Sequence, residues 1–162
     1  MLRELACADQ LNRNNLGGFF TDEDLWLMAT LNGATATATD DAIGVLAAGR
    51  VADVAIFDGA AAFDHRAILE AGAPEVVLVM RGGQTLYGDD AVVTALAGGA
   101  SCDVLDACGV AKRVCALGEV GMDLAALQTA AGALYPAFFC GATANEPSCV
   151  PSRPVSIDGS TI

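Results

Sequence analysis

Among the side chains that could take part in catalysis, acidic residues and cysteines are common in this chain, whereas histidine and lysine are scarce. It has one histidine, His65, and one lysine, Lys112, against 20 acidic residues and six cysteines. His65 follows Asp64, and such a pair can orient an imidazole as a proton acceptor. No Gly-x-Ser-x-Gly turn accompanies the pair, so the sequence does not indicate a serine nucleophile. We therefore interpret His65 as a surface residue or as the start of a helix.

Metal-ligand patterns are also missing from the sequence. A zinc ion in a protein is held by several histidine, cysteine or carboxylate ligands. The chain has no second histidine, and none of its cysteines forms a Cys-x-x-Cys pair. The acidic clusters at 22–24, 40–41 and 89–90 lack the spacing of a calcium loop. We expect no metal, no other cofactor and no catalytic residue in this chain.

The cysteines fall mostly in the last third of the chain. They are Cys7, Cys102, Cys108, Cys115, Cys140 and Cys149. Two interpretations stay open: disulfides that staple a core made mostly of alanine, or buried free thiols. Disulfides require an oxidising compartment, so this interpretation favours a periplasmic or secreted protein. Cys7 stands alone on the first predicted helix, and we expect it to be a reduced core residue.

The local sequence favours a disulfide between Cys140 and Cys149. The segment between them is rich in turn-forming residues and can fold back on itself. Cys108 and Cys115, if helical, lie about 10 Å apart along the helix axis, too far to bridge. We expect these two to be free or paired elsewhere, with Cys102 as one candidate partner.

Composition excludes several classes of protein. The chain has 162 residues, of which 54% are hydrophobic and 17% charged, so it can bury a core and is not expected to be disordered. A net charge of -12 leaves nothing to neutralise a run of phosphates, so we expect no nucleic-acid partner. No apolar stretch is long enough to span a bilayer.

The first part of the chain has the apolar spacing of helices. A stripe of leucine and alanine predicts a helix over residues 1–12. Thr21, followed by Asp24, forms a capping-box pattern that opens a second helix, which continues to about residue 31. Asn32-Gly33 then interrupts it, and 34–39 form one more short helical turn.

The middle of the chain changes period. Val51–Phe57 and Val76–Met80 are nearly continuous, valine-rich apolar runs, which are typical of strands covered on both faces. A short helix is predicted between them, over 64–71. Gly82-Gly83 follows the second run and predicts a two-residue hairpin turn.

The last third is predicted to be helical. Apolar residues and cysteines over 104–115 share one face of a helix, which Gly109 weakens. A clearer stripe over 124–134 predicts another helix, ended by Pro136. The tail that follows shows no period.

One set of residues has a recognisable order and spacing. It consists of Thr30, Asn32, Gly44, Gly49, Arg50, Asp53, Gly82 and Gly83. We call these eight positions the pattern residues. They resemble the C-terminal signature and closing hairpin of the metal-dependent amidohydrolase superfamily, and the resemblance covers residues 1–93. The glycines permit sharp turns, and Asp53 stands where a carboxylate can bond local backbone as a strand begins. We interpret all eight as structural.

The resemblance implies a mixed α and β fold. Residues 1–38 would be the terminal helices of a (β/α)8 barrel. Residues 39–93 would form part of the family's small composite β-sandwich. Residues 94–162 would be a helical, Cys-rich extension.

The resemblance also implies a function. The family hydrolyses carbon–nitrogen bonds of cyclic amides, imides and related substrates with one or two divalent metal ions, typically zinc, which activate water. Its ligands lie on barrel strands that precede the part resembled here. We expect a C-terminal fragment that is inactive alone, with the missing barrel portion or further copies of itself as partner. A non-catalytic binding or assembly module and a small secreted disulfide-stabilised protein remain as alternatives.

Overall fold

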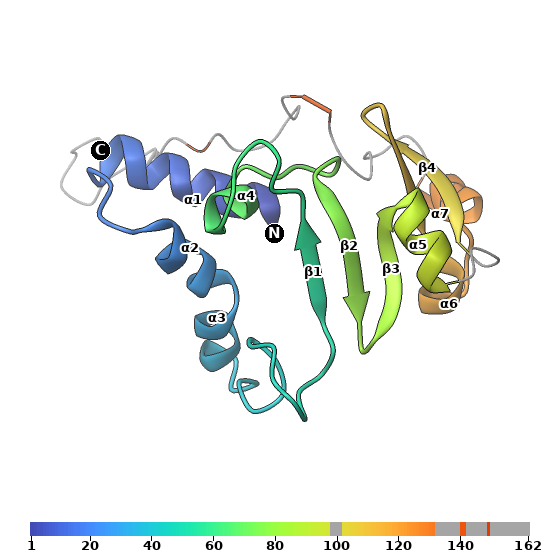
Figure 1. Cartoon of the computed structure of the whole chain (residues 1–162), viewed down its shortest axis with the longest axis horizontal. Coiled ribbons are helices and arrows are strands. Elements are labelled where there is room, and N and C mark those ends of the chain that lie inside the picture. Colours follow the sequence, from blue (N-terminus) through green and yellow to red (C-terminus); the bar gives the residue numbers. More distant parts are fainter. Residues whose placement is uncertain (98–101, 132–139, 142–148, 150–162) are drawn as a thin grey trace.

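The computed structural model describes residues 1–97, 102–131, 140–141 and 149. The helices are α1 (Leu2–Asn15), α2 (Asp22–Ala29), α3 (Leu31–Ala36), α4 (His65–Leu69), α5 (Asp90–Ala97), α6 (Ala116–Val120) and α7 (Leu124–Ala131). The strands are β1 (Val54–Phe57), β2 (Val76–Arg81), β3 (Gln84–Asp89), β4 (Asp103–Ala107) and β5 (Val110–Val114). The mixed α and β fold that the resemblance implied is therefore confirmed. Figure 1 shows α1, α2 and α3 on one side of the sheet and α5, α6 and α7 towards its other end.

The first two helices form where the apolar spacing predicts them. The capping box is present: the Asp24 amide donates to Thr21 Oγ1 at 3.1 Å, and the Thr21 amide donates to Asp24 Oδ2 at 2.9 Å. These bonds satisfy amides at the start of α2 that have no partner inside the helix. The expected break at Asn32-Gly33 falls instead at Thr30, and both of those residues lie within α3.

The strands form one antiparallel sheet in the order β1-β2-β3-β5-β4. Gly82 and Gly83 have φ angles of 55° and 80°, which a two-residue turn of this hand requires, so the predicted hairpin between β2 and β3 is confirmed. β1 begins at Val54, later than expected. Its Ile56 is 45% exposed, so the expectation that this strand is covered on both faces is wrong. Its neighbour Ala55 points to the opposite face and is exposed too, as befits a strand that stands first in the order of the sheet.

The predicted helix over 104–115 is wrong, because these residues form the hairpin of β4 and β5. Cys108 and Gly109 make its turn, with φ angles of 59° and 88°. The glycine that weakens the helical pattern is thus a turn residue. β5 pairs with β3, so the sheet continues beyond residue 93 rather than giving way to a helical extension. The second helix predicted in this region is present as α7, while Leu134 and Pro136 lie outside the described residues.

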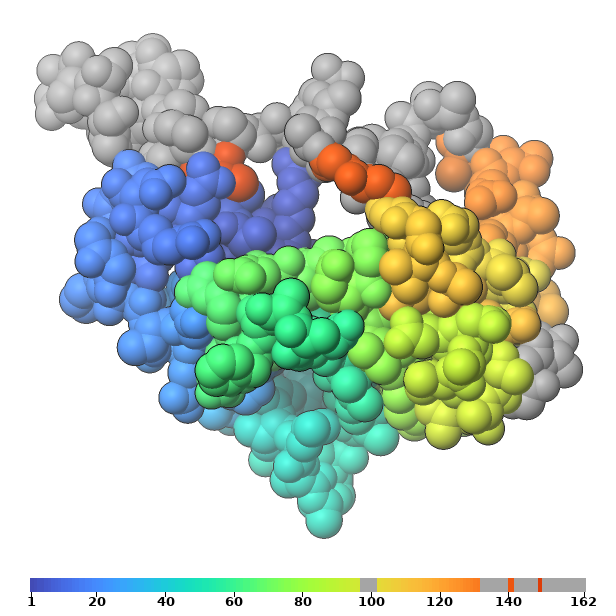
Figure 2. Space-filling view, turned by 45° about the horizontal axis from the view of Figure 1, so that its top comes forward, coloured from blue at the N-terminus to red at the C-terminus, as the bar shows by residue number. Residues whose placement is uncertain are grey.

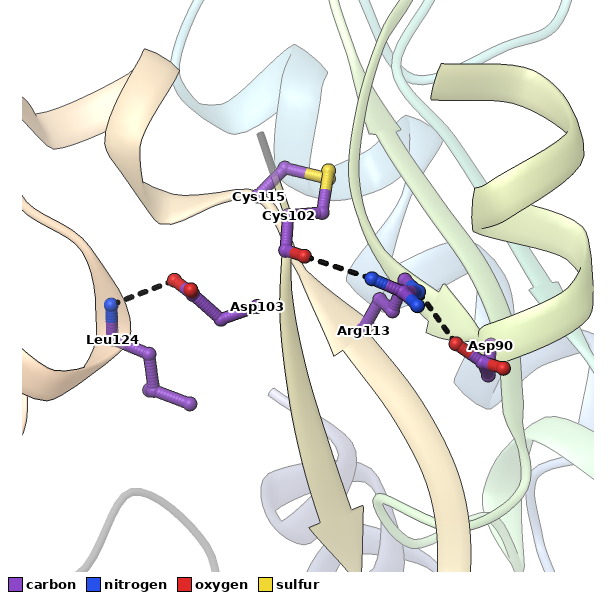
Figure 3. The surroundings of a disulfide bond; sticks show 6 residues. All are labelled: Asp90, Cys102, Asp103, Arg113, Cys115 and Leu124. Atoms are coloured by element: carbon purple, nitrogen blue, oxygen red, sulfur yellow. Dashed lines mark hydrogen bonds and ion pairs between the residues drawn. A yellow bond between two sulfur atoms is a disulfide. The ribbon is translucent and has the colours of Figure 1, made fainter. Parts of the chain in front are cut away.

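A disulfide between Cys102 and Cys115 closes the open end of this hairpin (Figure 3). Arg113 lies beside it, donating to the Cys102 carbonyl at 3.0 Å and pairing with Asp90 at the start of α5. Asp103 Oδ2 accepts the Leu124 amide at 2.9 Å. The hairpin is therefore held to both α5 and α7.

The expected disulfide between Cys140 and Cys149 is wrong. Cys140 is bonded to Cys108 and Cys149 to Cys7, with Cα–Cα distances of 5.4 Å and 4.9 Å. Cys7 is therefore oxidised, not a reduced core residue. Cys102, the candidate partner for Cys108 or Cys115, is bonded to Cys115. Cys140 and Cys149 are close in sequence, which favoured a local disulfide. The fold instead brings each of them within bonding distance of a more distant cysteine.

Two separate apolar clusters lie under these elements. Leu5, Leu25 and Leu69 form one, between α1, α2 and α4. Leu78, Val93 and Cys102 form the other, between the sheet and α5. We call α1–α4 the helical part and β1–β5 with α5 the sheet part.

Candidate functional site

The pattern residues around the first strand meet the β2–β3 turn. Asp53 Oδ1 accepts the Gly82 amide at 2.7 Å, and the Ala52 carbonyl accepts the Gly83 amide at 2.9 Å. Positions far apart in sequence are thus joined through a carboxylate and backbone groups. The Asp53 carboxylate therefore stabilises a turn, as polar side chains near the start of a strand often do.

The loop before β1 is shaped by the other pattern residues. Arg50 donates from Nη1 to the Asp40 carbonyl, whereas Asp53 accepts from the β2–β3 turn. Gly44 has a φ of 94°, and a Cβ built there would lie 2.8 Å from the Ala34 Cβ. Gly49 has a φ of 87° in open space. These contacts position the loop that leads to β1.

The remaining pattern residues lie at the junction of α2 and α3. Thr30 Oγ1 donates to the Trp26 carbonyl at 2.9 Å, and Asn32 is exposed. The structure therefore brings the pattern residues into two groups, one at this junction and its loop, one at the hairpin turn.

Sequence reasoning missed a polar cluster between three helices, which we call the Arg66 cluster: Asp9, Arg13, Asp22 and Arg66. Arg66 donates from Nε to Asp22 Oδ2 and from Nη1 to Asp9 Oδ2, both at 2.8 Å, and its Nη2 pairs with Asp22 Oδ1. Arg13 Nη2 lies 2.6 Å from Asp9 Oδ2. α1, α2 and α4 are thus joined by charge as well as by leucine packing.

One carboxylate of the Arg66 cluster is almost completely buried. The Asp9 side chain is only 3% exposed, and its Oδ1 is a buried atom without a hydrogen-bond partner among the described residues. The carboxylates raise the pKa of Arg66 above its ordinary value, chiefly through the hydrogen bond to Asp22 and then through the one to Asp9. A signal was present in the sequence, because Asp9 follows the buried Leu5 by four residues on the same helix face.

A shallow hollow of about 370 Å³ opens beside this cluster. Asp22, His65 and Arg66 line it together with the loop 61–64. The His65 ring packs on Trp26 with centroids 4.8 Å apart, and its Nδ1 lies 3.3 Å from Asp64 Oδ1. Asp64 has φ 59° and ψ -149°, a backbone region that glycine usually occupies.

The hollow does not hold an assembled catalytic set. An imidazole beside a carboxylate can accept a proton, but Arg66 is already committed to Asp22 and Asp9, and the lining contains no serine, threonine or cysteine that the imidazole could activate. His65 lies at the start of α4, which confirms the interpretation made from the sequence.

The single lysine is a buried structural residue. Lys112 is 1% exposed, donates to the Val76 carbonyl at 2.9 Å and pairs with Asp89 on the neighbouring strand. It secures β5 against β2 and β3.

A zinc centre does not fit the donors available. The part of the chain that the structure describes contains no group of three or more His, Cys, Asp or Glu side chains able to hold a metal. All six cysteines are in disulfides and so provide no thiolate. In the same described ranges, no helix is long and apolar enough to cross a membrane.

Comparison with known proteins indicates the same family as the order and spacing of the pattern residues do. The model of the amidohydrolase family matches residues 3–86, more than half of the chain. The match ends within β3, so α5, β4, β5 and the tail lie beyond it. Neither a curated protein nor a solved structure matches the chain.

Proposed function

Because the chain belongs to the amidohydrolase family, we propose that it is the scaffold part of a hydrolase that cleaves non-peptide carbon–nitrogen bonds. In this proposal it works with a barrel portion that carries the metal ions, and it is inactive alone. The proposal rests on the contacts that the pattern residues make in this structure. Asp53, Arg50 and Gly44 are engaged in turns and loop packing rather than directed at a ligand.

The edge of the sheet supports a composite arrangement. Among the strands that the structure describes, β1 stands first in the order, so it pairs with β2 on one side and has an edge on the other. Such an edge offers backbone donors and acceptors to a further strand. We propose that a strand from the other portion of the hydrolase adds here and completes a sandwich.

The helical part supplies a second surface for the same partner. A small apolar hollow of about 200 Å³ lies between α1 and α2, and its lining is nearly all apolar. Met1 and Met28 at its rim are 84% and 43% exposed. We propose that α1 and α2 cover barrel strands, as terminal barrel helices would.

Export from the cytoplasm belongs to the same proposal. Three disulfides support an oxidising compartment, because such bonds persist there and are rare in the cytosol. The disulfides are also compatible with the alternative of a small secreted protein stabilised by disulfides. Unlike the composite hydrolase, such a protein would need no partner.

Metal binding and activity of the oxidised chain test the proposal. Elemental analysis after dialysis against zinc should find no stoichiometric metal, and the chain alone should not hydrolyse cyclic amides or imides. Mixing it with an amidohydrolase barrel whose own C-terminal segment has been deleted should restore activity. The Asp53→Ala variant is the matched control and should restore less, since its β2–β3 turn is no longer held. One tightly bound zinc per chain, or turnover by the chain alone, would contradict the proposal.

A further inference from the structure

The proposed scaffold role gives no task to the hollow beside the Arg66 cluster. Its volume of about 370 Å³ lies within the range of small-molecule sites in proteins. The loop 61–64 and the first residues of α4 line it, together with Asp22 at the start of α2. Figure 2 shows α4 and the loop before it in teal and green at the surface, beside the blue α1 and α2. A small molecule can therefore reach the hollow from solvent.

The charges that line the hollow favour a positively charged ligand. The Arg66 cluster has two carboxylates and two guanidinium groups that bond to one another, so it is neutral as a whole. Asp64 adds a further carboxylate, and its side chain is 74% exposed. The imidazole of His65 lies beside this carboxylate but carries a positive charge only when it is protonated. Asp64 therefore gives the hollow an excess of negative charge.

Aromatic rings stand next to this carboxylate. Phe63, which lines the hollow, precedes Asp64 in the chain and is 82% exposed. The His65 ring packs on Trp26 with centroids 4.8 Å apart, which fixes the orientation of the imidazole. The face of an aromatic ring attracts a cation. A flat cation can therefore pack on Phe63 while its N–H groups donate to the Asp64 carboxylate.

The loop that carries these side chains is held by hydrogen bonds at both ends. At its start, the Asp58 amide donates to the Glu75 carbonyl at 2.8 Å. At its end, the Ala67 amide donates to the Asp64 carbonyl at 3.1 Å, so Asp64 is joined to the first turn of α4. A ligand that binds to a loop already held in place loses less free energy in ordering it.

We propose that this hollow binds a small organic cation in which an amidinium or guanidinium group is attached to a flat apolar body. The N–H groups of the cation donate to the Asp64 carboxylate, and the apolar body packs on Phe63. Arg66 stays bonded to Asp22 and Asp9 and keeps the floor of the cluster in place. This binding requires no barrel portion, so it stands or falls separately from the proposed scaffold role.

Titration of the full oxidised chain with benzamidine, followed by NMR at constant ionic strength, tests the site. The backbone amides of residues 61–66 and the indole N–H of Trp26, the single tryptophan, should shift and saturate in the millimolar range, as expected for so small a ligand. Benzamide has nearly the same shape without the charge and should bind several-fold more weakly. Benzoate, which Asp64 repels, should leave these signals unchanged.

Two variants locate the site. Asp64→Asn keeps a residue type that tolerates positive φ, and Phe63→Ala removes the exposed ring. Each should weaken benzamidine binding by about two- to fivefold, the loss expected for an ion pair or a cation–π contact near solvent. Asp41→Asn is the matched control, because it removes the same charge at an exposed loop position outside the lining and should leave the affinity unchanged. Equal binding of benzamide and benzamidine, no saturable shift at residues 61–66, or an unchanged affinity in Asp64→Asn would overturn the proposal, and the first two comparisons need no variant to fold.

Discussion

At the residue scale, the pattern residues act through backbone geometry and packing. Gly44 combines a positive φ with close packing on α3, whereas Gly49 has a similar φ in open space. The two glycines therefore separate the cost of backbone strain from the cost of steric overlap.

We predict that Gly44→Ala destabilises the chain more than Gly49→Ala does. The Gly49 substitution should cost about 1 kcal/mol, from the left-handed backbone alone. At Gly44 the new Cβ would also meet the Ala34 Cβ at 2.8 Å, so the cost should reach about 2–4 kcal/mol. Denaturant unfolding of the oxidised variants measures both. Equal losses would show that packing on α3 is not what selects glycine at position 44.

The capping box of α2 provides a prediction about pH. The Thr21 hydroxyl, and then its amide, lower the pKa of Asp24 by bonding to the carboxylate. A lowered folded-state pKa means that the box stabilises α2 above the ordinary carboxyl pKa of about 3.9. The stabilisation is lost as the pH falls through the lowered value.

Thr21→Ala should therefore move the pKa of Asp24 back up towards its ordinary value, and Thr21→Ser should leave it lowered. NMR titration of the Asp24 carboxyl carbon distinguishes the two variants. A carboxyl that titrates identically in both would mean that the threonine hydroxyl is not the cause.

At the element scale, β5 is attached to the rest of the sheet by a buried charge. Lys112 and Asp89 stand opposite each other in the pairing of β5 with β3, and the lysine also reaches the Val76 carbonyl on β2. Asp89 is 35% exposed, so water can solvate it if the lysine is lost.

We predict that Lys112→Ala costs about 3 kcal/mol and Lys112→Met only about 1–2 kcal/mol. Alanine leaves a void as well as an unpaired carbonyl, whereas methionine fills much of the space. The free energy of unfolding, with hydrogen exchange at β5 amides as a local measure, checks the order. If methionine costs as much as alanine, the charge rather than the volume secures β5.

At the scale of the whole molecule, apolar surface remains exposed despite the acidic charge. Ile56 on the edge strand is 45% exposed, and Phe63 beside the hollow is 82% exposed. Exposed edges and apolar patches promote pairing with other chains.

We therefore predict that the isolated chain self-associates, and that Ile56→Lys reduces this association by placing a charge on the edge strand. Leu46→Lys makes the same charge change at a 76% exposed loop position and should have a smaller effect. Sedimentation velocity over a range of concentrations measures both. A wild-type chain that stays monomeric at high concentration would contradict this prediction and weaken the proposed composite sandwich.

The sequence by itself determined the elements whose causes are local. The capping box needs only Thr21 and Asp24 three residues apart, and the β2–β3 turn needs only adjacent glycines that accept positive φ. The apolar stripe of α1 likewise follows from its own spacing. The order and spacing of the pattern residues indicated the family, because their turns depend on nearby backbone geometry.

Only the tertiary structure decided the remaining features, since each depends on partners distant in sequence. The 104–115 segment has usable helical spacing, but pairing with β3 and the bond between Cys102 and Cys115 select a hairpin. α5 was not predicted, and the burial of Val93 against Leu78 explains its position. Disulfide pairing is the clearest example of a feature that the sequence alone does not predict. Short loops close easily in an unfolded chain, but a folded chain pairs whichever cysteines its packing brings to bonding distance, and here these are Cys7 with Cys149 and Cys108 with Cys140.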